Sequence, residues 1–214
     1  MECPVMVTYS GVWFPLDPFE LREEHIKLDD IVWHLSMRPR WEGAVTRPYS
    51  VAEHSIFVSE LAEEHYREFM RASSEIMEPK DIAYVRLYAL LYDAHEAYPP
   101  GDVCSPWKKI HPEISTWQRL VQEIIYGSLN LTSPDELQRK VIAVADRSAL
   151  VAEAAGLLTF AAYGQVRSHC PEWPWGELRS RDFYFRGMGL PVAEVREQFH
   201  ELLVGLLEEV RNGG

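Results

Sequence analysis

Cysteine is scarce in this sequence, and basic residues are outnumbered by acidic ones. The chain of 214 residues has three cysteines, Cys3, Cys104 and Cys170, which are widely spaced and form no CxxC pair. This pattern argues against a disulfide framework and a thiolate zinc site, and it fits a reducing compartment. The formal net charge is -12. We therefore expect no nucleic-acid polymer as a partner, because binding one requires a basic face that displaces counterions.

Long hydrophobic runs are also absent. No apolar run reaches the roughly 18 residues that span a bilayer. The segment 1–17 lacks the basic region and apolar core of a signal peptide. We therefore expect no membrane association and a cytoplasmic location, which would be the host cytoplasm if a phage encodes the protein.

Strand-like alternation is nearly absent, and helical periodicity dominates instead. It predicts helices over 28–37, 51–72, 79–98, 112–129, 133–158 and 192–212. No linker divides the chain, so we expect one all-α domain over 1–214, a single helical bundle. The block 168–191, rich in Trp, Pro and Gly, would form a cap, a substrate wall or a subunit contact.

Local signals mark the starts of several helices. They are N-cap residues, a capping box in which two side chains satisfy each other's backbone amides, and prolines in the first turn. In chain order they are Asp29 or Asp30, Ser50 with Glu53, Pro112, and Ser133 with Pro134.

His54 lies in the first turn of the helix predicted over 51–72. Val58 and Leu61 follow it on the same face, so His54 points inward. A lone inward histidine is most simply a core residue bonded to a carbonyl.

Acidic residues extend the apolar faces of two other predicted helices. Asp93 and Glu96 continue the stripe of the helix over 79–98, and Asp146 stands alone in "VIAVADRSALVA". Burying an unpaired carboxylate costs several kcal/mol, and Arg147 points about 100° away from Asp146. Each acid therefore needs a distant Arg or Lys partner or a metal ion, unless, for Asp93, the helix end frays and water reaches the carboxylate.

Together, His54, Asp93 and Asp146 favour the metal. One inward imidazole and two carboxylates from three helices suit Mn²⁺, Co²⁺, Mg²⁺ or Fe²⁺. Glu96, one helical turn after Asp93, would then be placed as a general acid or base.

The order of these motifs resembles that of the HD-domain metal-dependent phosphohydrolases. The similar branches are the YfbR-type 5'-deoxynucleotidases and the phage dNTP triphosphohydrolases of the DatZ type. The segments that carry the resemblance are "WHLSMRPRW", "RPYSVAEHS", "LLYDAHEAYPPGDVCSPWK" and "VIAVAD". They cover about 29–155, and 156–214 would pack on this motif core as a C-terminal extension.

The resemblance implies an HD-like helical domain with a catalytic metal. It assigns His54, Asp93 and Asp146 as ligands of Mn²⁺, Co²⁺ or Mg²⁺. It assigns Glu96 as the acid that positions a metal-activated water for attack on phosphorus, and Asp102 as a second acid at the substrate pocket.

The same resemblance implies a small-molecule partner, a deoxynucleotide from which one or three phosphates are removed. Arg40 and Trp41 match a pair near phosphate and sugar, and Lys108 would meet phosphate. The plainer interpretations are a core aromatic for Trp41 and a solvated charge for Lys108. The family also implies a homo-oligomer, a dimer or larger.

Two positions depart from the family pattern. Tyr92 stands where the signature histidine is expected, and the loop between Glu96 and Asp102 has one extra residue. A neutral tyrosine, with a pKa near 10, is a poor ligand. His95 lies about 200° around the predicted helix from Asp93, so we do not expect both to face one ion.

His34 is either a further ligand or a hydrogen-bonded structural histidine, and we favour the second. Tyr92 also keeps an alternative function open. The chain would then be a nucleotide-binding or regulatory protein that retains the fold with a weakened or lost metal site.

Overall fold

The computed structural model describes residues 4–73, 78–173, 175 and 190–212. The α-helices are α1 (Leu28–Met37), α2 (Val51–Ser73), α3 (Pro79–Leu90), α4 (Ser105–Ile110), α5 (Pro112–Ser128), α6 (Glu136–Leu157), α7 (Phe160–His169) and α8 (Val192–Asn212). Short 3-10 helices are η1 (Glu23–His25), η2 (Trp41–Gly43) and η3 (Ala94–Ala97). The all-α prediction is confirmed.

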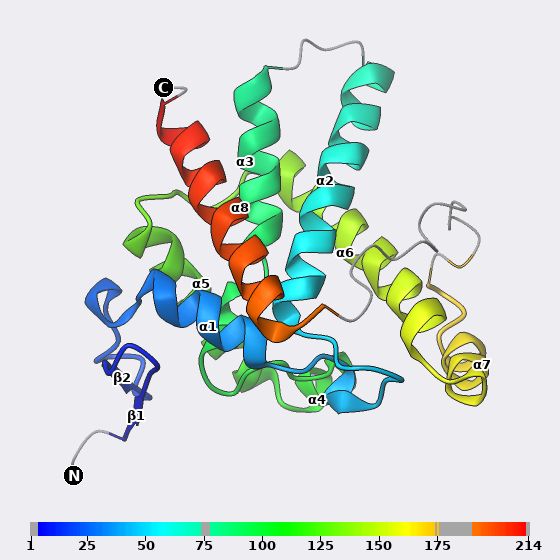
Figure 1. Ribbon diagram of the computed structural model, residues 1–214, viewed down its shortest axis with the longest axis horizontal. Coiled ribbons are helices and arrows are strands. Elements are labelled where there is room, and N and C mark those ends of the chain that lie inside the picture. Colours follow the sequence, from blue (N-terminus) through cyan, green and yellow to red (C-terminus); the bar gives the residue numbers. More distant parts are fainter. Residues whose placement is uncertain (1–3, 74–77, 174, 176–189, 213–214) are drawn as a thin grey trace.

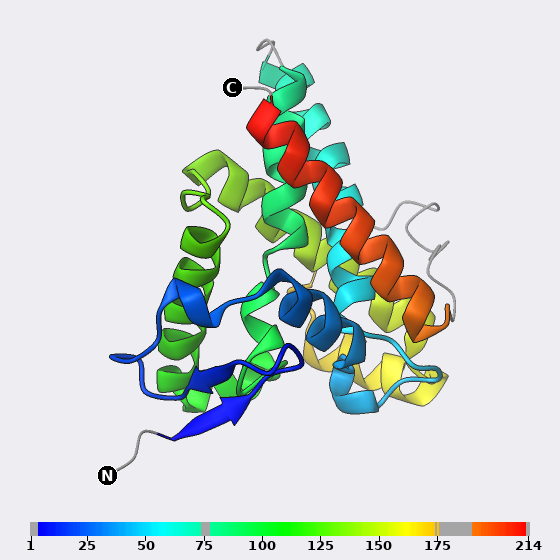
Figure 2. The same cartoon turned by 60° about the vertical axis from the view of Figure 1, so that its left-hand side comes forward.

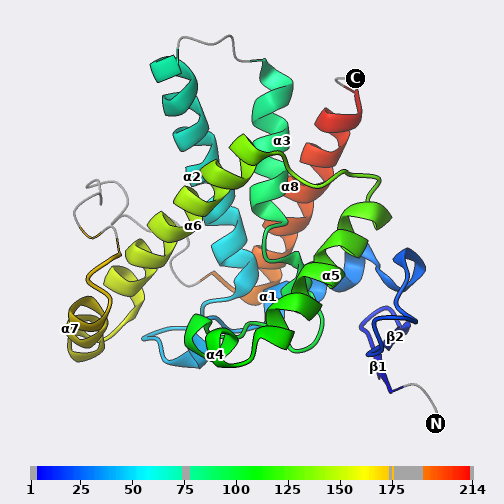
Figure 3. The ribbon, with the colours of Figure 1, turned by 180° about the vertical axis from the view of Figure 1, so that it is seen from behind.

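Long helices form the centre of the fold. Helices α2 and α3 lie side by side and antiparallel, and α6 crosses behind them (Figures 1 and 3). Helix α8 packs on α1, α2 and α3. The buried side chains between these helices are mostly aliphatic, and they include Val58, Leu87, Leu90, Phe199 and Leu203.

A small hairpin is the exception to the helical plan. Strands β1 (Val5–Val7) and β2 (Trp13–Pro15) pair antiparallel with Met6 opposite Phe14. Figure 2 shows the hairpin beside α1. The buried Asp30 carboxylate of α1 accepts bonds from the Ser10 amide at 2.7 Å and the Ser10 hydroxyl at 2.8 Å, which fixes the hairpin there.

The predicted helix starts are partly confirmed. The capping box forms before α2: the Ser50 amide donates to Glu53 Oε2 at 2.8 Å, and the Glu53 amide donates to Ser50 Oγ at 3.2 Å. Pro112 is the first residue of α5, as expected.

The predicted starts of two other helices were wrong. The N-cap of α1 is Lys27, because Asp30 binds the hairpin instead of the helix end. Helix α6 starts at Glu136, and its N-cap is Asp135, which accepts from the Gln138 amide at 2.8 Å.

The end of α3 is the main difference from the predicted helices. The helix stops at Leu90 instead of continuing to Tyr98. In an α-helix the His95 amide would donate to the Leu91 carbonyl. Instead, the side-chain Nε2 of Gln122, on α5, donates to the Leu91 carbonyl at 2.9 Å, and its Oε1 accepts from the backbone amide of His95 at 3.0 Å. Because Gln122 satisfies both backbone groups, the chain turns there.

The structure also bears on whether the chain could span a membrane and on the state of its cysteines. Among the described helices, none is both long and apolar enough to cross a bilayer. In the same part of the chain, Cys104 and Cys170 are free thiols. Most of the block 168–191 lies outside the described residues, so its expected roles are not addressed by the structure.

Candidate metal centre

The three expected ligands come together at one end of the α2–α3 pair. His54 lies in the first turn of α2, Asp93 follows α3, and Asp146 lies midway along α6. Their ligand atoms lie within 4.8 Å of one another. His54 Nε2 is 3.4 Å from Asp93 Oδ2 and 3.2 Å from Asp146 Oδ1.

His54 is held in one orientation by Glu153. The Nδ1 atom of this buried imidazole donates to Glu153 Oε1 at 2.5 Å. Its Nε2 atom is buried too and makes no hydrogen bond to any described residue. Nε2 therefore faces two carboxylates, an arrangement that requires either a proton or a cation between them.

The charge on His54 agrees with this geometry. Burial and Arg40 lower the pKa of His54, but Glu153, Asp146 and Asp93 raise it more, so the net pKa lies well above the usual value. Without metal the two carboxylates therefore favour the protonated form of the imidazole. Binding a divalent ion would release that proton. The donor set of one imidazole and two carboxylates fits such an ion.

Glu153 was not predicted as a site residue. It is fully buried and accepts from Tyr49 Oη at 3.1 Å, Trp41 Nε1 at 3.0 Å and Arg40 Nε at 3.3 Å, as well as from His54. Burial raises its pKa, but Arg40 and His54 outweigh burial and lower it to about 2. The sequence feature that could have identified Glu153 is its position seven residues after Asp146, on the same face of α6 and among small apolar residues.

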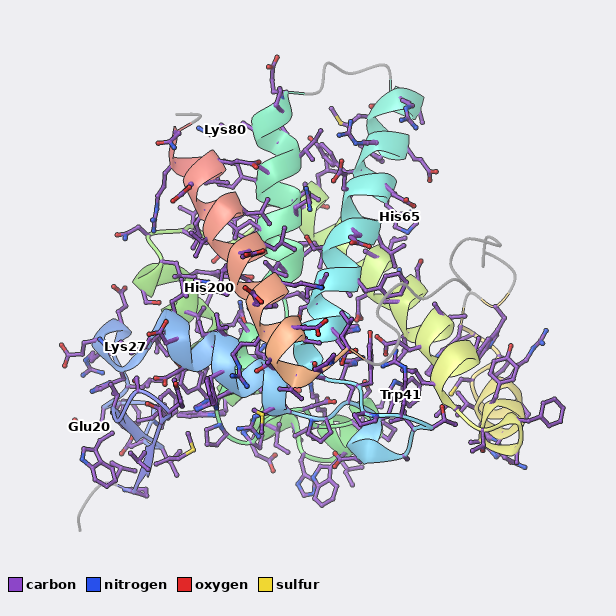
Figure 4. All side chains as sticks on the ribbon, viewed as in Figure 1. Glu20, Lys27, Trp41, His65, Lys80 and His200 are labelled. Carbon is purple, nitrogen blue, oxygen red and sulfur yellow. The ribbon has the colours of Figure 1, made fainter. Side chains whose placement is uncertain are left out.

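Arg40 and Trp41 are positioned by this carboxylate. Arg40 also lies near Asp93, with Nη1 3.5 Å from Oδ2, so its guanidinium links Asp93 to Glu153. Trp41 has a left-handed backbone with φ of 57°, a conformation that costs energy in a non-glycine residue. Figure 4 shows Trp41 on the segment between α1 and α2. Its indole nitrogen donates to Glu153, and the residue is only partly buried.

Glu96 is buried beside a lysine of α4. It is 2% exposed, and its Oε1 lies 3.6 Å from Lys108 Nζ of α4. Its Oε2 is buried without a hydrogen-bond partner among the described residues. Burial, Asp93 and Asp102 raise the pKa of Glu96 well above the usual value. Lys108 is thus directed to the site and is not a solvated charge.

Asp102 and Arg38 lie close enough to Glu96 to interact with it electrostatically. Burial raises the pKa of Asp102, and Asp93 adds to this effect against Arg40 and Lys108. Burial lowers the pKa of Arg38, whereas Glu96 and Asp102 raise it. Arg38 was not predicted from the sequence as a site residue. Its Nε is buried and has no hydrogen-bond partner within the described part of the chain.

Gly101 explains how Arg38 reaches this position. The glycine has a φ of 86°, and a Cβ there would lie 2.3 Å from Arg38 Nη1. Gln118 of α5 donates to the Gly101 carbonyl at 3.1 Å. The loop thus needs glycine both for its backbone conformation and for the approach of the guanidinium.

Tyr92 and His34, the two uncertain site residues, lie in different surroundings. Tyr92 is 40% exposed; burial of the rest of the side chain, together with Asp93 and Asp146, raises the pKa of its phenol, which stays neutral. His34 Nδ1 donates to the Ala97 carbonyl at 2.7 Å, and its Nε2 accepts from the Tyr9 amide at 3.2 Å. Both His34 nitrogens are used by the backbone, which supports the structural interpretation.

The expectation for His95 was wrong. The angle of about 200° assumed an α-helix, but residues Ala94–Ala97 form a 3-10 turn. A ring nitrogen of His95 instead lies within 4.8 Å of ligand oxygens of Asp93 and Glu96.

Comparisons with known proteins give distant relatives. The chain is 28% identical over 118 residues to the uncharacterized protein YfdR of Escherichia coli (strain K12), a match covering 55% of the chain and 54% of YfdR. It is 41% identical over 95 residues to the uncharacterized protein RCAP_rcc00048 of Rhodobacter capsulatus, covering 44% of the chain and 40% of that protein. The chain thus spans about half the length of these relatives or less. No family model matches it. Neither relative's name states an activity.

Proposed function

We propose that this chain is an HD-type metal-dependent phosphohydrolase that acts on a deoxynucleotide. The observation that carries the proposal is the buried His54, oriented by Glu153 with its Nε2 atom towards Asp93 and Asp146. Three ligand residues with open positions are typical of a catalytic centre, since they leave room for water and substrate.

The protein groups around the ligands have distinct roles in this proposal. His54, Asp93 and Asp146 would hold the ion. A divalent ion there would supply Lewis-acid polarisation of a phosphoryl oxygen and lower the pKa of a nearby water. Glu96, whose pKa is raised, holds or accepts a proton at Oε2. A raised pKa in a buried carboxylate suits this role near neutral pH.

Cations around the centre would meet the phosphate. Arg40 already interacts with two buried carboxylates and therefore serves mainly to fix Asp93 and Glu153. Lys108 and Arg38 are the cations nearer to Glu96 and Asp102, so we assign them the substrate phosphate. Trp41 and Asp102 would border the nucleoside.

A nucleotide panel tests the proposal. The protein is incubated with each dNMP and dNTP in Mn²⁺, Co²⁺ or Mg²⁺, and chromatography separates phosphate from triphosphate products. Asp146→Asn and Glu96→Gln should abolish turnover. Asp29→Asn, the same chemical change on the exposed face of α1, should not. The absence of turnover by the folded wild type on the whole panel would refute the proposal.

A second candidate function is nucleotide binding or regulation without metal. Tyr92, in place of the signature histidine, favours it. Mass spectrometry of metal content distinguishes the two, because a stoichiometric ion that is lost in Asp93→Ala contradicts the regulatory alternative. Tyr92 lies close enough to Asp93 and Asp146 for both to raise its pKa. Tyr92→His should therefore tighten metal binding, and an unchanged affinity would count against a weakened metal site.

A further inference from the structure

One side chain, His34 of α1, joins the N-terminal hairpin to the turn that carries Glu96. His34 Nδ1 donates to the Ala97 carbonyl at 2.7 Å, and its Nε2 accepts from the Tyr9 amide at 3.2 Å. Tyr9 lies in the loop between β1 and β2, and Ala97 is the last residue of η3. A neutral imidazole has one donor and one acceptor nitrogen, so these two bonds use both nitrogens and fix the tautomer.

The Ala97 carbonyl is a point from which two groups of the centre would be moved. Ala97 is buried and directly follows Glu96 in the chain. Its carbonyl also accepts from Arg38 Nη2 at 3.5 Å, and Arg38 is the cation assigned above to the substrate phosphate. A buried carbonyl needs a donor, and His34 is the nearer of the two. A shift of this carbonyl would therefore displace both Glu96 and Arg38.

Ring packing supports the same connection. Phe14 of β2 stacks on Tyr98 with ring centroids 4.4 Å apart, and His34 approaches the edge of the Tyr98 ring with centroids 6.1 Å apart. Phe14 and Tyr98 are both 0% exposed, and Tyr98 is the residue after η3. The hairpin thus reaches the chain beyond Glu96 by packing as well as through the His34 bonds.

The tip of the hairpin is itself fixed to two long helices. Tyr9 stacks on Trp33 of α1 with ring centroids 3.8 Å apart, and Arg196 of α8 lies 3.5 Å from the centroid of the Trp33 ring. The Ser10 hydroxyl donates to Asp30 of α1 at 2.8 Å. These contacts hold the hairpin beside α1, where Figure 2 shows it, so it is a firm support for the turn.

We propose that the N-terminal hairpin holds the turn that carries Glu96 in place, with His34 as the positioning residue between them. A displacement of about 1 Å at a catalytic group can lower the rate about 100-fold, so such a support matters for turnover. The inference rests on the proposed function for the role of Glu96. The connection itself can be measured in a protein that hydrolyses nothing.

Two substitutions of Tyr9 test the connection from the hairpin side. Tyr9 is the second residue of a β-turn closed by a bond from the Gly11 amide to the Thr8 carbonyl at 3.0 Å, a position where proline is favoured. Tyr9→Pro removes the amide that binds His34. Tyr9→Ala, the matched control, removes the same ring and keeps the amide.

Hydrogen exchange and turnover are then compared between the two Tyr9 variants. Exchange is read by mass spectrometry on a peptide that covers 94–101 and should be faster in Tyr9→Pro. With the nucleotide that the wild type hydrolyses fastest, kcat of Tyr9→Pro should be about 10-fold below that of Tyr9→Ala. The urea midpoints of the two variants should agree, so that a general loss of stability does not explain the difference.

Two substitutions of His34 separate its two bonds. The side-chain amide nitrogen of asparagine lies where Nδ1 is, and the side-chain oxygen of glutamine lies near the position of Nε2. His34→Asn therefore keeps a donor for Ala97, and His34→Gln keeps an acceptor for Tyr9. Both should lower kcat, and His34→Gln should lower it more, about 100-fold. The control is His200→Gln, an exposed histidine on α8 (Figure 4), which should match the wild type.

Equal exchange of 94–101 in Tyr9→Pro and Tyr9→Ala, or wild-type kcat in His34→Gln, would overturn the inference. Faster exchange in Tyr9→Pro, in a protein whose wild type hydrolyses no nucleotide, would refute the proposed function and keep the connection. Hydrolysis by the wild type with equal exchange in the two Tyr9 variants would do the reverse.

Discussion

The centre consists of two halves that differ in how well their polar groups are satisfied. In the helical half, on α2 and α6, Glu153 accepts bonds from four side chains, and its pKa falls to about 2. In the turn half, after α3, Glu96 Oε1 pairs with Lys108 Nζ at 3.6 Å, Oε2 has no hydrogen-bond partner among the described residues, and the pKa of Glu96 is raised. Both carboxylates are almost fully buried, so burial alone does not explain the difference.

The difference indicates that the two halves have different roles. The helical half has a complete hydrogen-bond network, which stabilises the fold and fixes the orientation of His54. The turn half keeps a carboxylate in an unfavourable environment, as expected for a group that gains its partner from a metal or substrate. Removing the buried carboxylate of the helical half should therefore destabilise the metal-free protein far more than neutralising the buried carboxylate of the turn half.

The largest effect is expected in the helical half, for Glu153→Ala. Removing this carboxylate leaves Arg40 and His54 buried without their partner, which typically costs about 3–5 kcal/mol of unfolding free energy. Urea unfolding of the metal-free protein measures it. Glu197→Ala, on the exposed face of α8, is the control and should change stability by less than ~0.5 kcal/mol. A loss no larger than that of the control would show that the network does not stabilise the fold.

A smaller effect is expected for the loop of the turn half, at Gly101. Gly101→Ala introduces a Cβ 2.3 Å from Arg38 Nη1 at a φ of 86°, so we expect a loss of about 1–3 kcal/mol. The matched control is Gly205→Ala on α8, where nothing lies within 4 Å of the new Cβ. There the gain should be about 0.5–1 kcal/mol, because alanine favours the helix. Equal changes at both positions would contradict the proposed tight packing of Arg38 on the loop.

The helical half was the part that the sequence could predict. The Ser50–Glu53 capping box placed His54 in the first turn of α2, and the period of α6 turned Asp146 inward. Glu153 could have been found by the same period. Its omission came from treating Asp146 as an isolated acid, although two acids seven residues apart lie on one helix face.

The turn half could not be predicted from local sequence. The segment 79–98 has the composition of a continuous helix, and the bonds that end it come from Gln122, which is 31 residues from Leu91 in the chain. Such a long-range partner overrides local propensity. The expectation for His95 failed for this reason, since its angle was calculated for a helix that Gln122 interrupts.

The smallest effect is expected for Glu96→Gln in the metal-free protein, because relief of repulsion from Asp93 and Asp102 is partly offset by loss of the Lys108 ion pair. The folded pKa of Glu96 lies above that of the unfolded chain, about 4.3. Folding therefore retains a proton that the unfolded chain releases, and wild-type stability falls as pH rises from about 4.3 through the folded pKa. Glutamine does not titrate. Glu96→Gln should match the wild type near pH 4 and exceed its urea midpoint increasingly towards pH 8. A wild type that gains on the variant over this range would mean that Lys108 compensates Glu96 fully, and the two halves would then not differ in strain.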